Sequence, residues 1–440
     1  MGRRGRREGR AAGGRRRGWR RREPGRQRRR PSNHARDRQP SPGGAERQVV
    51  YTASRLKARG FARCEIVVTD DLGDPRGDYR AMLDAAGVVA RRAGDAFDAR
   101  VAAALRDDAP LRDAASRLPA ALRPRAADLF GEFVAARPHI VHCWLDHTNI
   151  WGGVAAALAG VPAIVLSTRS LNPRHFPHLY QPWFDEWYHV LAMLPNVHLI
   201  NNSRPGAADY AAWLGLPPER FTVILNGLDL SAMRRADERA VAAFRDEIAA
   251  RPGDRLLVSV FRIGDEKQPH IFAAVAERLL AEFADLRIVV AGTGPMEGQM
   301  RALARRGPNA DRFHLVGARR DVPTVLSAAS LFLLTSRVEG TPNVLLEAQH
   351  LGCPAVTTAA GGAVDAVLDG VTGVVRPIGD LDGLADACAR LLRDEPRRAA
   401  MAGAGPAFVA ARFGMERMID ETLGVYERAL GRTIGRSRPG

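Results

Sequence analysis

The chain has 440 residues, a formal net charge of +16 at pH 7 and a hydrophobic content of 46%. This length suits two or three domains with buried cores, and the apolar content excludes a chain that is disordered throughout. No apolar run reaches the roughly 18 residues of a membrane-spanning helix, and the charged N-terminus is unlike a secretory signal peptide. We therefore expect a cytoplasmic protein.

Most of the positive charge lies in the first 40 residues, which contain 17 arginines and three acidic residues. The other 400 residues are nearly neutral, with 48 basic and 46 acidic side chains. Because residues 1–42 are poor in apolar side chains, we expect a disordered Arg-rich tail. Its charge suits peripheral contact with an anionic membrane, at the inner face of the plasma membrane. Nucleic acid is a less favoured partner, because charge alone supports it. Alternatively, the arginines reflect the composition of the whole chain, in which arginine is the usual cation and Lys57 and Lys267 are the only lysines.

The first helix is expected to open at Gly43 and Gly44 and to continue to Arg59. A glycine-rich turn that opens a helix in an α/β domain normally follows a buried strand. Residues 30–42 contain no apolar run from which that strand could form. Either the domain lacks its first strand, or residues 1–42 come from a wrong start or a wrong reading frame.

From residue 65 onward, short apolar runs alternate with helical patterns, which indicates parallel sheets in an α/β fold. Several runs are nearly continuous Val, Ile and Leu, as in strands that are buried on both faces. The expected strands are residues 65–69, 139–142, 163–167, 197–201, 221–225, 255–260, 286–291, 313–316, 331–335, 354–357 and 373–375. So many strands suit two doubly wound domains better than one.

A turn-rich break at residues 251–254 is the expected boundary between the two domains. We expect one Rossmann-like domain at residues 43–250 and a second at residues 251–412. An amphipathic helix at residues 413–430 is expected to pack back across them.

The strongest signal for a site lies in residues 336–348, directly after the expected strand at residues 331–335. Thr341 is suited to the N-cap of a helix and Pro342 to its first position, which places Glu339 in the loop and Glu347 inside the helix. Free backbone amides at residues 340–344 would then hold an anion such as phosphate, and a carboxylate beside it could accept hydrogen bonds from sugar hydroxyls. The alternative is a solvated acidic pair on an ordinary βα unit.

Glu339 and Glu347, which have seven residues between them, resemble the E-x7-E motif of retaining glycosyltransferases of family 4. These enzymes have the GT-B fold, in which two doubly wound Rossmann-like domains face each other across a cleft. The resemblance covers roughly residues 43–430. Further segments match in the family's order: the loop facing the donor at residues 43–48, the V-x-x-N-G-V-D segment at 223–229, the Arg/Lys loop at 261–268, the glycine-rich turn at 291–295 and the nucleobase loop at 315–322.

The resemblance implies that Arg262 and Lys267 neutralise the diphosphate of a nucleotide sugar, where a cation pair would stabilise the charge on the leaving nucleotide. It implies that Glu339 holds the transferred sugar and that Glu347 binds the ribose. The other implied donor-binding residues are Gly44, Gly292, Gly294, Val316, Gly317, Gly340, Thr341, Asn343 and Val344. No metal and no cofactor are implied. A D-x-D pattern at residues 380–382 precedes an expected helix, and capping is its favoured role.

On the acceptor side, His142 ends the expected strand at residues 139–142, and Asp146 and His147 follow it. They are candidates for acceptor binding and, for His142, for proton transfer, although a satisfied loop histidine is an equal alternative. Many family members carry a second histidine where this chain has Trp144. Arg169 completes the predicted acceptor-binding set.

The expected function is a hexosyltransferase of class EC 2.4 that retains anomeric configuration. It would move a sugar from a nucleotide-diphosphate sugar to a saccharide or lipid-linked acceptor in the synthesis of bacterial cell-surface polysaccharide. One alternative is another activity on the same fold, such as a phosphorylase or a sugar-nucleotide epimerase. A further alternative is a non-catalytic protein that lacks the first strand.

Overall fold

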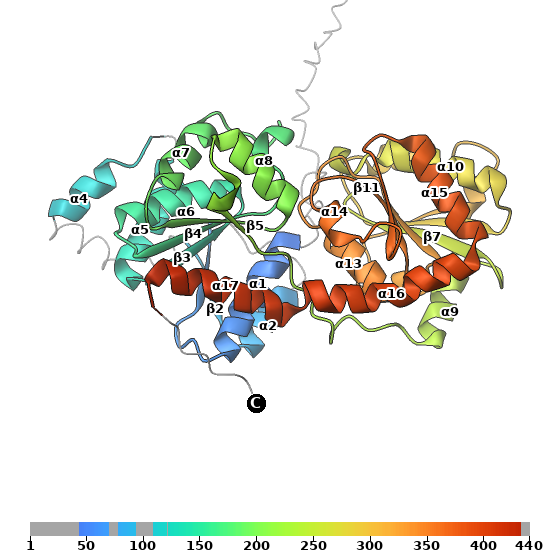
Figure 1. The fold of residues 1–440 in the computed structure, drawn as a ribbon, viewed down its shortest axis with the longest axis horizontal. Coiled ribbons are helices and arrows are strands. Elements are labelled where there is room, and N and C mark those ends of the chain that lie inside the picture. The colour runs from blue at the N-terminus through green and yellow to red at the C-terminus, as the bar shows by residue number, and fades with distance from the viewer. Residues whose placement is uncertain (1–43, 70–77, 94–108, 121, 433–440) are drawn as a thin grey trace, which may run out of the picture. The chain divides into compact units, whose positions relative to one another are not determined.

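The structure is a computed structural model that describes residues 44–69, 78–93, 109–120 and 122–432. Every paired strand in these ranges is parallel, and the strands form three sheets (Figure 1). The strands are β1 (Glu65–Val68), β2 (Val89–Arg92), β3 (Ile140–Trp144), β4 (Ala163–Thr168), β5 (Val197–Asn201), β6 (Phe221–Val223), β7 (Arg255–Val260), β8 (Leu286–Ala291), β9 (Phe313–Gly317), β10 (Leu331–Leu334), β11 (Ala355–Thr358) and β12 (Gly373–Arg376).

Helices connect the parallel strands, as crossover connections in parallel sheets require. Those before residue 250 are α1 (Gly44–Ala58), α2 (Asp78–Ala85), α4 (Ala109–Ser116), α5 (Arg123–Ala136), α6 (Asp146–Leu158), α7 (Trp183–Ala192), α8 (Arg204–Leu214) and α9 (Glu238–Glu247). Those after it are α10 (Pro269–Glu282), α11 (Glu297–Ala304), α12 (Val322–Ser327), α13 (Asn343–His350), α14 (Ala363–Ala366), α15 (Leu381–Arg393), α16 (Glu395–Phe413) and α17 (Met415–Leu430). No helix in the described ranges combines the length and apolar character that a membrane span requires.

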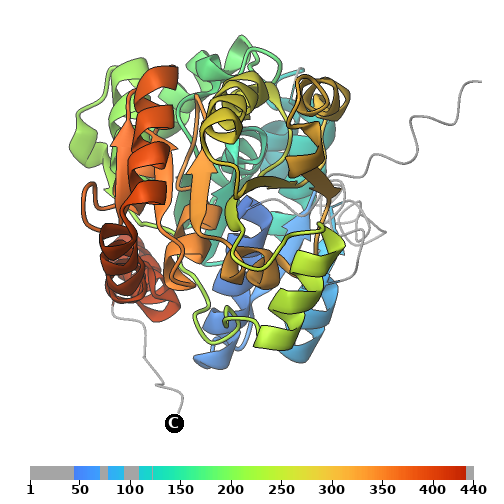
Figure 2. The ribbon, with the colours of Figure 1, turned by 90° about the vertical axis from the view of Figure 1, so that its right-hand side faces the viewer.

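The second half of the chain forms one six-stranded sheet in the order β12-β11-β10-β7-β8-β9. Helices cover both of its faces, with α10 and α15 on one side and α13 and α16 on the other (Figures 1 and 2). Its central strands are fully buried, which explains their continuous apolar sequence. At the start of α15, Asp380 accepts a hydrogen bond of 2.8 Å from the amide of Gly383, so the predicted capping role of this aspartate is confirmed.

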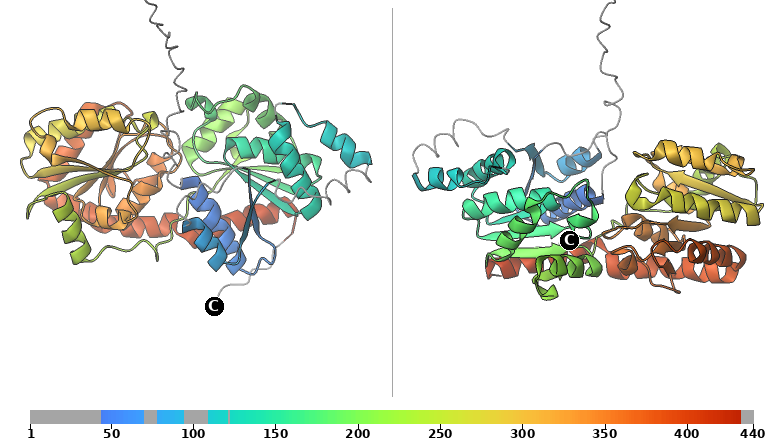
Figure 3. Two further views of the ribbon diagram at one scale, coloured as in Figure 1. Left: turned by 180° about the vertical axis from the view of Figure 1, so that it is seen from behind. Right: turned by 90° about the horizontal axis from the view of Figure 1, so that it is seen from above.

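The first half forms a four-stranded sheet, β3-β4-β5-β6, and a separate two-stranded sheet, β1-β2 (Figure 3). All the expected strands are present, and β2 is an additional one. It escaped prediction because its four residues include Arg91 and Arg92 and two of the four are exposed. Among the described residues α1 is the first element, and the expectations for residues 1–42, including the disordered tail and the missing strand, lie outside the described ranges.

Helix α17 returns to the first half of the chain and packs against β4 and β5 (Figure 1). Met418 and Ile419 lie in one buried apolar cluster with Val165 of β4 and Ile200 of β5. Just before α17, the amide of Leu228 donates a hydrogen bond of 2.7 Å to the carbonyl of Phe413. Strands β4 and β5 therefore depend on the C-terminal helix for the cover on one face.

Replacement of Ile419 by alanine should destabilise the four-stranded sheet by about 2–4 kcal/mol, because it leaves a cavity in a fully buried cluster. Hydrogen exchange at β4 and β5 should accelerate while the six-stranded sheet stays protected. Arg428→Ala, at an exposed position of the same helix, is the matched control and should change stability by less than about 0.5 kcal/mol. Equal exchange in the two variants would contradict this role for α17.

Candidate active site

Most predicted site residues lie near or beyond the carboxyl ends of parallel strands, where ligands bind in open α/β sheets. The predicted donor-side residues other than Gly44 lie in the loops after β7, β8 and β10, at the end of β9 and in α13. The acceptor candidates lie in β3, at the start of α6 and just after β4. All described residues belong to one compact unit, in which the two halves of the chain contact each other.

Glu339 lies between Lys267 and Ser336 in the loop after β10. The Lys267 ammonium forms an ion pair with Glu339 Oε1, and the Ser336 hydroxyl donates to the same oxygen at 2.6 Å. The side chains of Lys267 and Glu339 are only 18% and 9% exposed. The Thr335 hydroxyl also donates to the Lys267 carbonyl at 2.9 Å. The structure thus brings two predicted catalytic residues into direct contact.

The glycine-rich turn after β8 is fastened to the loop after β7. Gly292 has a φ of +135°, and a Cβ atom there would lie 1.9 Å from the Phe261 carbonyl oxygen. A Cβ atom on Gly294 would lie 2.4 Å from the carbonyl oxygen of Ile263. Neither position can carry a side chain in this backbone arrangement. The glycines therefore allow two loops to approach, and direct contact of these two residues with a donor stays a prediction.

The remaining predicted residues of these loops differ in exposure. The side chain of Arg262 is 55% exposed and lies 3.4 Å from Glu266, so it is available to an incoming anion. Val316 and Gly317 end β9, and the Gly317 carbonyl accepts a hydrogen bond of 2.7 Å from Gly292. The expected nucleobase loop is thus joined to the glycine-rich turn.

Glu347 is held by a residue that the sequence did not single out. Arg47 of α1 forms an ion pair with Glu347 Oε1, and the Glu347 side chain is 6% exposed. Burial lowers the pKa of Arg47, but the Glu347 carboxylate more than compensates, so the net shift is upward. A Cβ atom on neighbouring Gly44 would lie 3.0 Å from Asn343 Nδ2. The resemblance of residues 43–48 to the donor-facing loop was the signal that could have found Arg47.

The start of α13 corrects one expectation. The helix begins at Asn343 with Pro342 at the cap position and no side-chain cap, so the prediction that Thr341 caps it is wrong. The Thr341 hydroxyl instead donates to the Asn202 carbonyl. Asn226 Nδ2 donates to Asn343 Oδ1 at 2.7 Å and to the Thr341 carbonyl at 3.1 Å. Thr341 thus joins the two halves of the chain instead of starting the helix. Val344, the second residue of α13, is partly buried against the hydrophobic core.

Beside this contact, Arg204 at the start of α8 binds Asp365 twice. Its amide and its Nη1 atom each donate to a carboxylate oxygen of Asp365 at 2.7 Å. The Asp365 side chain is only 7% exposed, so Arg204 pairs with both oxygens of a buried carboxylate.

His142 is the middle residue of β3 and lies within a group of aromatic rings. Its Nδ1 atom lies 2.7 Å from the Tyr426 hydroxyl of α17, and its ring stacks on Trp144 at 4.6 Å. Burial, assisted by the positive charge of Arg169, lowers the pKa of His142 to about 3. The ring is therefore neutral at pH 7, and the role of His142 in proton transfer stays a prediction.

Asp146 and His147 begin α6 and have protein partners. The hydroxyls of Tyr188 and Tyr210 donate to Asp146 Oδ1 at 2.6 and 2.5 Å. Burial raises the pKa of Asp146, while these two hydrogen bonds oppose that shift. His147 packs against Phe184 at 4.9 Å. These contacts account for both residues structurally, so acceptor binding by them also stays a prediction.

Comparison with known proteins agrees with this geometry. The family described as Glycosyltransferase Family 4 matches residues 42–232, and the family described as Glycosyl transferases group 1 matches residues 241–408. The two matches meet between β6 and β7, where the strands change from one sheet to the other. The chain is a glycosyltransferase with a Family 4 domain followed by a group 1 domain.

This glycosyltransferase is 30% identical over 293 residues to the Vi polysaccharide biosynthesis protein VipC/TviE of Salmonella typhi, covering 64% of this chain and 51% of that protein. It is 26% identical over 265 residues to the UDP-Gal:alpha-D-GlcNAc-diphosphoundecaprenol alpha-1,3-galactosyltransferase of Escherichia coli, covering 58% of this chain and 67% of that protein. The chain therefore spans about half the length of the first relative and two thirds of the second.

Anabaena Alr3699/HepE, whose crystal structure contains UDP and glucose, matches the fold with a TM-score of 0.71 at 19% identity. The match covers 88% of this glycosyltransferase and 97% of the Anabaena chain. The expected GT-B fold is therefore confirmed.

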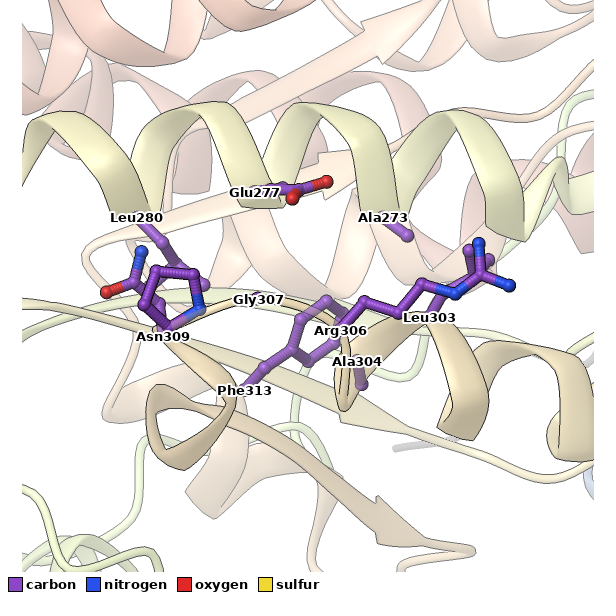
Figure 4. Close-up of a pocket in the computed structure, with 10 residues that line it drawn as sticks. Ala273, Glu277, Leu280, Leu303, Ala304, Arg306, Gly307, Asn309 and Phe313 are labelled. Carbon is purple, nitrogen blue, oxygen red and sulfur yellow. The ribbon is translucent and has the colours of Figure 1, made fainter.

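The pocket drawn in Figure 4 is separate from the site loops of this glycosyltransferase. Glu277 and Leu280 of α10 line it together with Arg306, Asn309 and Phe313. Because Phe313 begins β9, the pocket lies at the amino ends of the strands, and none of the predicted site residues lines it.

The neutral state of His142 predicts a loss of stability in acid. Unfolded chains bind a proton at histidine near pH 6.5, whereas folded His142 does so only near pH 3. This contribution is therefore fully present above pH 6.5 and decreases as the pH falls toward 3. Lowering the pH from 7.5 to 5.5 should cost the wild type about 1 kcal/mol more than His142→Asn, as measured by urea unfolding. The same pH dependence in both proteins would contradict the assignment.

Proposed function

We propose that this glycosyltransferase moves a sugar from a nucleotide-diphosphate sugar to a saccharide or lipid-linked acceptor in polysaccharide biosynthesis, with retention of anomeric configuration. The observation that carries the proposal is the contact of Lys267 with Glu339 beside the start of α13, with Glu347 inside the same helix. A cation from the loop after β7 thus contacts a βα unit that carries two carboxylates and the start of a helix, as recognition of a diphosphate and a sugar requires.

The donor is proposed to exchange partners with this ion pair. The diphosphate would take Lys267, joined by the exposed Arg262, and would release Glu339 to accept hydrogen bonds from the transferred sugar. The two cations and the start of α13 would stabilise the charge that develops on the leaving diphosphate, and we propose that no metal is needed for this. The donor phosphate, in place of an enzyme nucleophile, would take the proton of the acceptor hydroxyl on the same face of the sugar.

The relatives support a uridine nucleotide and a lipid-linked acceptor as the first candidates to test. The crystal structure of the Anabaena protein contains UDP, and the name of the Escherichia coli relative gives UDP-Gal and a diphosphoundecaprenol-linked acceptor. The other nucleotides are tested beside it, because Val316 and Gly317, which are expected to contact the base, carry no polar side-chain group that would select one base.

The donor site is tested by the thermal shift of the full chain with UDP, GDP, ADP and CDP. A nucleotide at about 100 times its Kd should stabilise the protein by roughly 2.7 kcal/mol. Lys267→Ala should abolish this shift because it removes a cation that is proposed to bind the diphosphate. Glu347→Ala should also abolish it, because it removes the carboxylate that is proposed to bind the ribose hydroxyls. Lys57→Ala is the matched control, since Lys57 is the only other lysine and its ammonium caps the Ala62 carbonyl at 2.7 Å.

A shift that is lost in both site variants and kept in Lys57→Ala would support a donor site and name the nucleotide. A chain that melts cooperatively but responds to no nucleotide would contradict the proposal, and would favour a non-catalytic protein. An unchanged shift in Lys267→Ala would place the nucleotide elsewhere.

A further inference from the structure

Three cations near the contact between the two halves have a carboxylate partner. Arg47 pairs with Glu347, Lys267 with Glu339, and Arg204 with Asp365. Arg169, which directly follows β4, has no ion pair with any residue in the described ranges. The cation without a partner is therefore the one that requires an explanation.

The Arg169 guanidinium is held in position by neutral groups. It lies over the Trp144 ring at 4.7 Å, and its Nη2 atom donates to Asn226 Oδ1. Its buried Nε atom has no hydrogen-bond partner, and neither does the buried Oδ1 of Asn202. A cation held by a ring and an amide, with its buried Nε donor unused, is oriented for a further acceptor.

Arg169 is also next to the loop that carries Glu339. A Cβ atom on Gly340 would lie only 2.0 Å from the Arg169 carbonyl oxygen, so the two backbones are in contact. Its side chain faces Trp144 and therefore the end of β3, where the acceptor is predicted to bind. Arg169 thus stands between the proposed sites of the transferred sugar and the acceptor.

A guanidinium in this position is costly unless an anion joins it. Burial without a counter-charge lowers the pKa of Arg169 to about 9, so the group is still a cation at pH 7. A neutral side chain could supply the single hydrogen bond to Asn226 without the desolvation that a charge requires. The planar fork of arginine is instead matched to carboxylate and phosphate, which it binds through two parallel hydrogen bonds.

We propose that Arg169 recognises an anionic group, a carboxylate or a phosphate, that is carried by the transferred sugar or by the acceptor. This inference rests on the proposed function, because it assigns a substrate class to the same site. The donor diphosphate is a different anion and is assigned to Arg262 and Lys267 on the other half of the chain. Arg169 is therefore a specificity residue that selects acidic sugars over neutral ones.

The experiment measures affinities of the full chain for matched neutral and acidic ligands by calorimetry. UDP-glucose and UDP-glucuronic acid differ only at C6 and test the transferred sugar, with UDP alone as reference. Two pairs test the acceptor side, with and without UDP: methyl α-D-galactoside with methyl α-D-galacturonoside, and methyl α-D-glucoside with glucose 1-phosphate. If another nucleotide gives the thermal shift, its sugar pair replaces the UDP pair.

The wild type should bind at least one acidic ligand about tenfold or more tightly than its neutral counterpart, as a charged hydrogen-bonded pair provides. Arg169→Gln should abolish that preference and leave the affinity for the nucleotide itself unchanged. Arg169→Lys should retain part of the preference, since it keeps the charge but not the fork. Arg220→Gln is the control and should behave as wild type, because Arg220 directly precedes β6 and therefore lies at the amino end of that strand, away from the site.

Two results would overturn the inference. One is equal binding of every acidic and neutral pair by the wild type. The other is a loss of nucleotide affinity in Arg169→Gln that matches the loss in Lys267→Ala, which would make Arg169 a ligand of the diphosphate. Failure of the proposed function looks different, since no nucleotide would bind at all while the methyl glycosides and glucose 1-phosphate would still report on Arg169.

Discussion

The ion pair of Lys267 with Glu339 is the contact around which the rest of the site is arranged. It joins the loop after β7 to the loop after β10, and Ser336 and Thr335 hold its two ends in place. A carboxylate and an ammonium that are withdrawn from water together offset part of each other's desolvation cost and orient each other. The same two side chains are those that a diphosphate and a sugar would need, so the pair keeps both functional groups ready for exchange.

The close approach of three loops depends on glycines for which no other residue would fit. A Cβ atom on Gly361, whose φ is +48°, would lie 2.0 Å from the Glu339 carbonyl oxygen, and one on Gly362 would lie 2.4 Å from that of Gly340. Gly340 in turn contacts the Arg169 carbonyl. The backbone around Glu339 is therefore fixed by contacts from the loops after β4 and β11, and its carboxylate is positioned by packing as well as by Lys267.

Sequence patterns predicted the elements and the βα units of this fold well, but not the partners of the charged residues. Periodicity located the buried strands. It missed β2 because two of the four residues of that strand are arginines, which leaves too short an apolar run to be recognised. Local spacing also placed Glu339 and Glu347 correctly on one unit. It could not find Arg47, which is 300 positions from Glu347, because only the tertiary fold brings the two together. The error at Thr341 has the same origin: a distant carbonyl, that of Asn202, competes for the hydroxyl that local rules assign to the helix.

In the two ion pairs that join the halves of the chain beside the site, both cations come from the same half. Arg47 and Arg204 come from the first half, whereas their partners Glu347 and Asp365 come from the second. This complementarity selects one register of the halves, because a shift of one loop would leave a buried carboxylate without its cation. Arg169 comes from the first half as well, and the second half offers it no carboxylate. If a substrate supplies that missing charge, every one of these cations has an anionic partner. The binding of an acidic sugar and the fit of the two halves then depend on the same set of ion pairs.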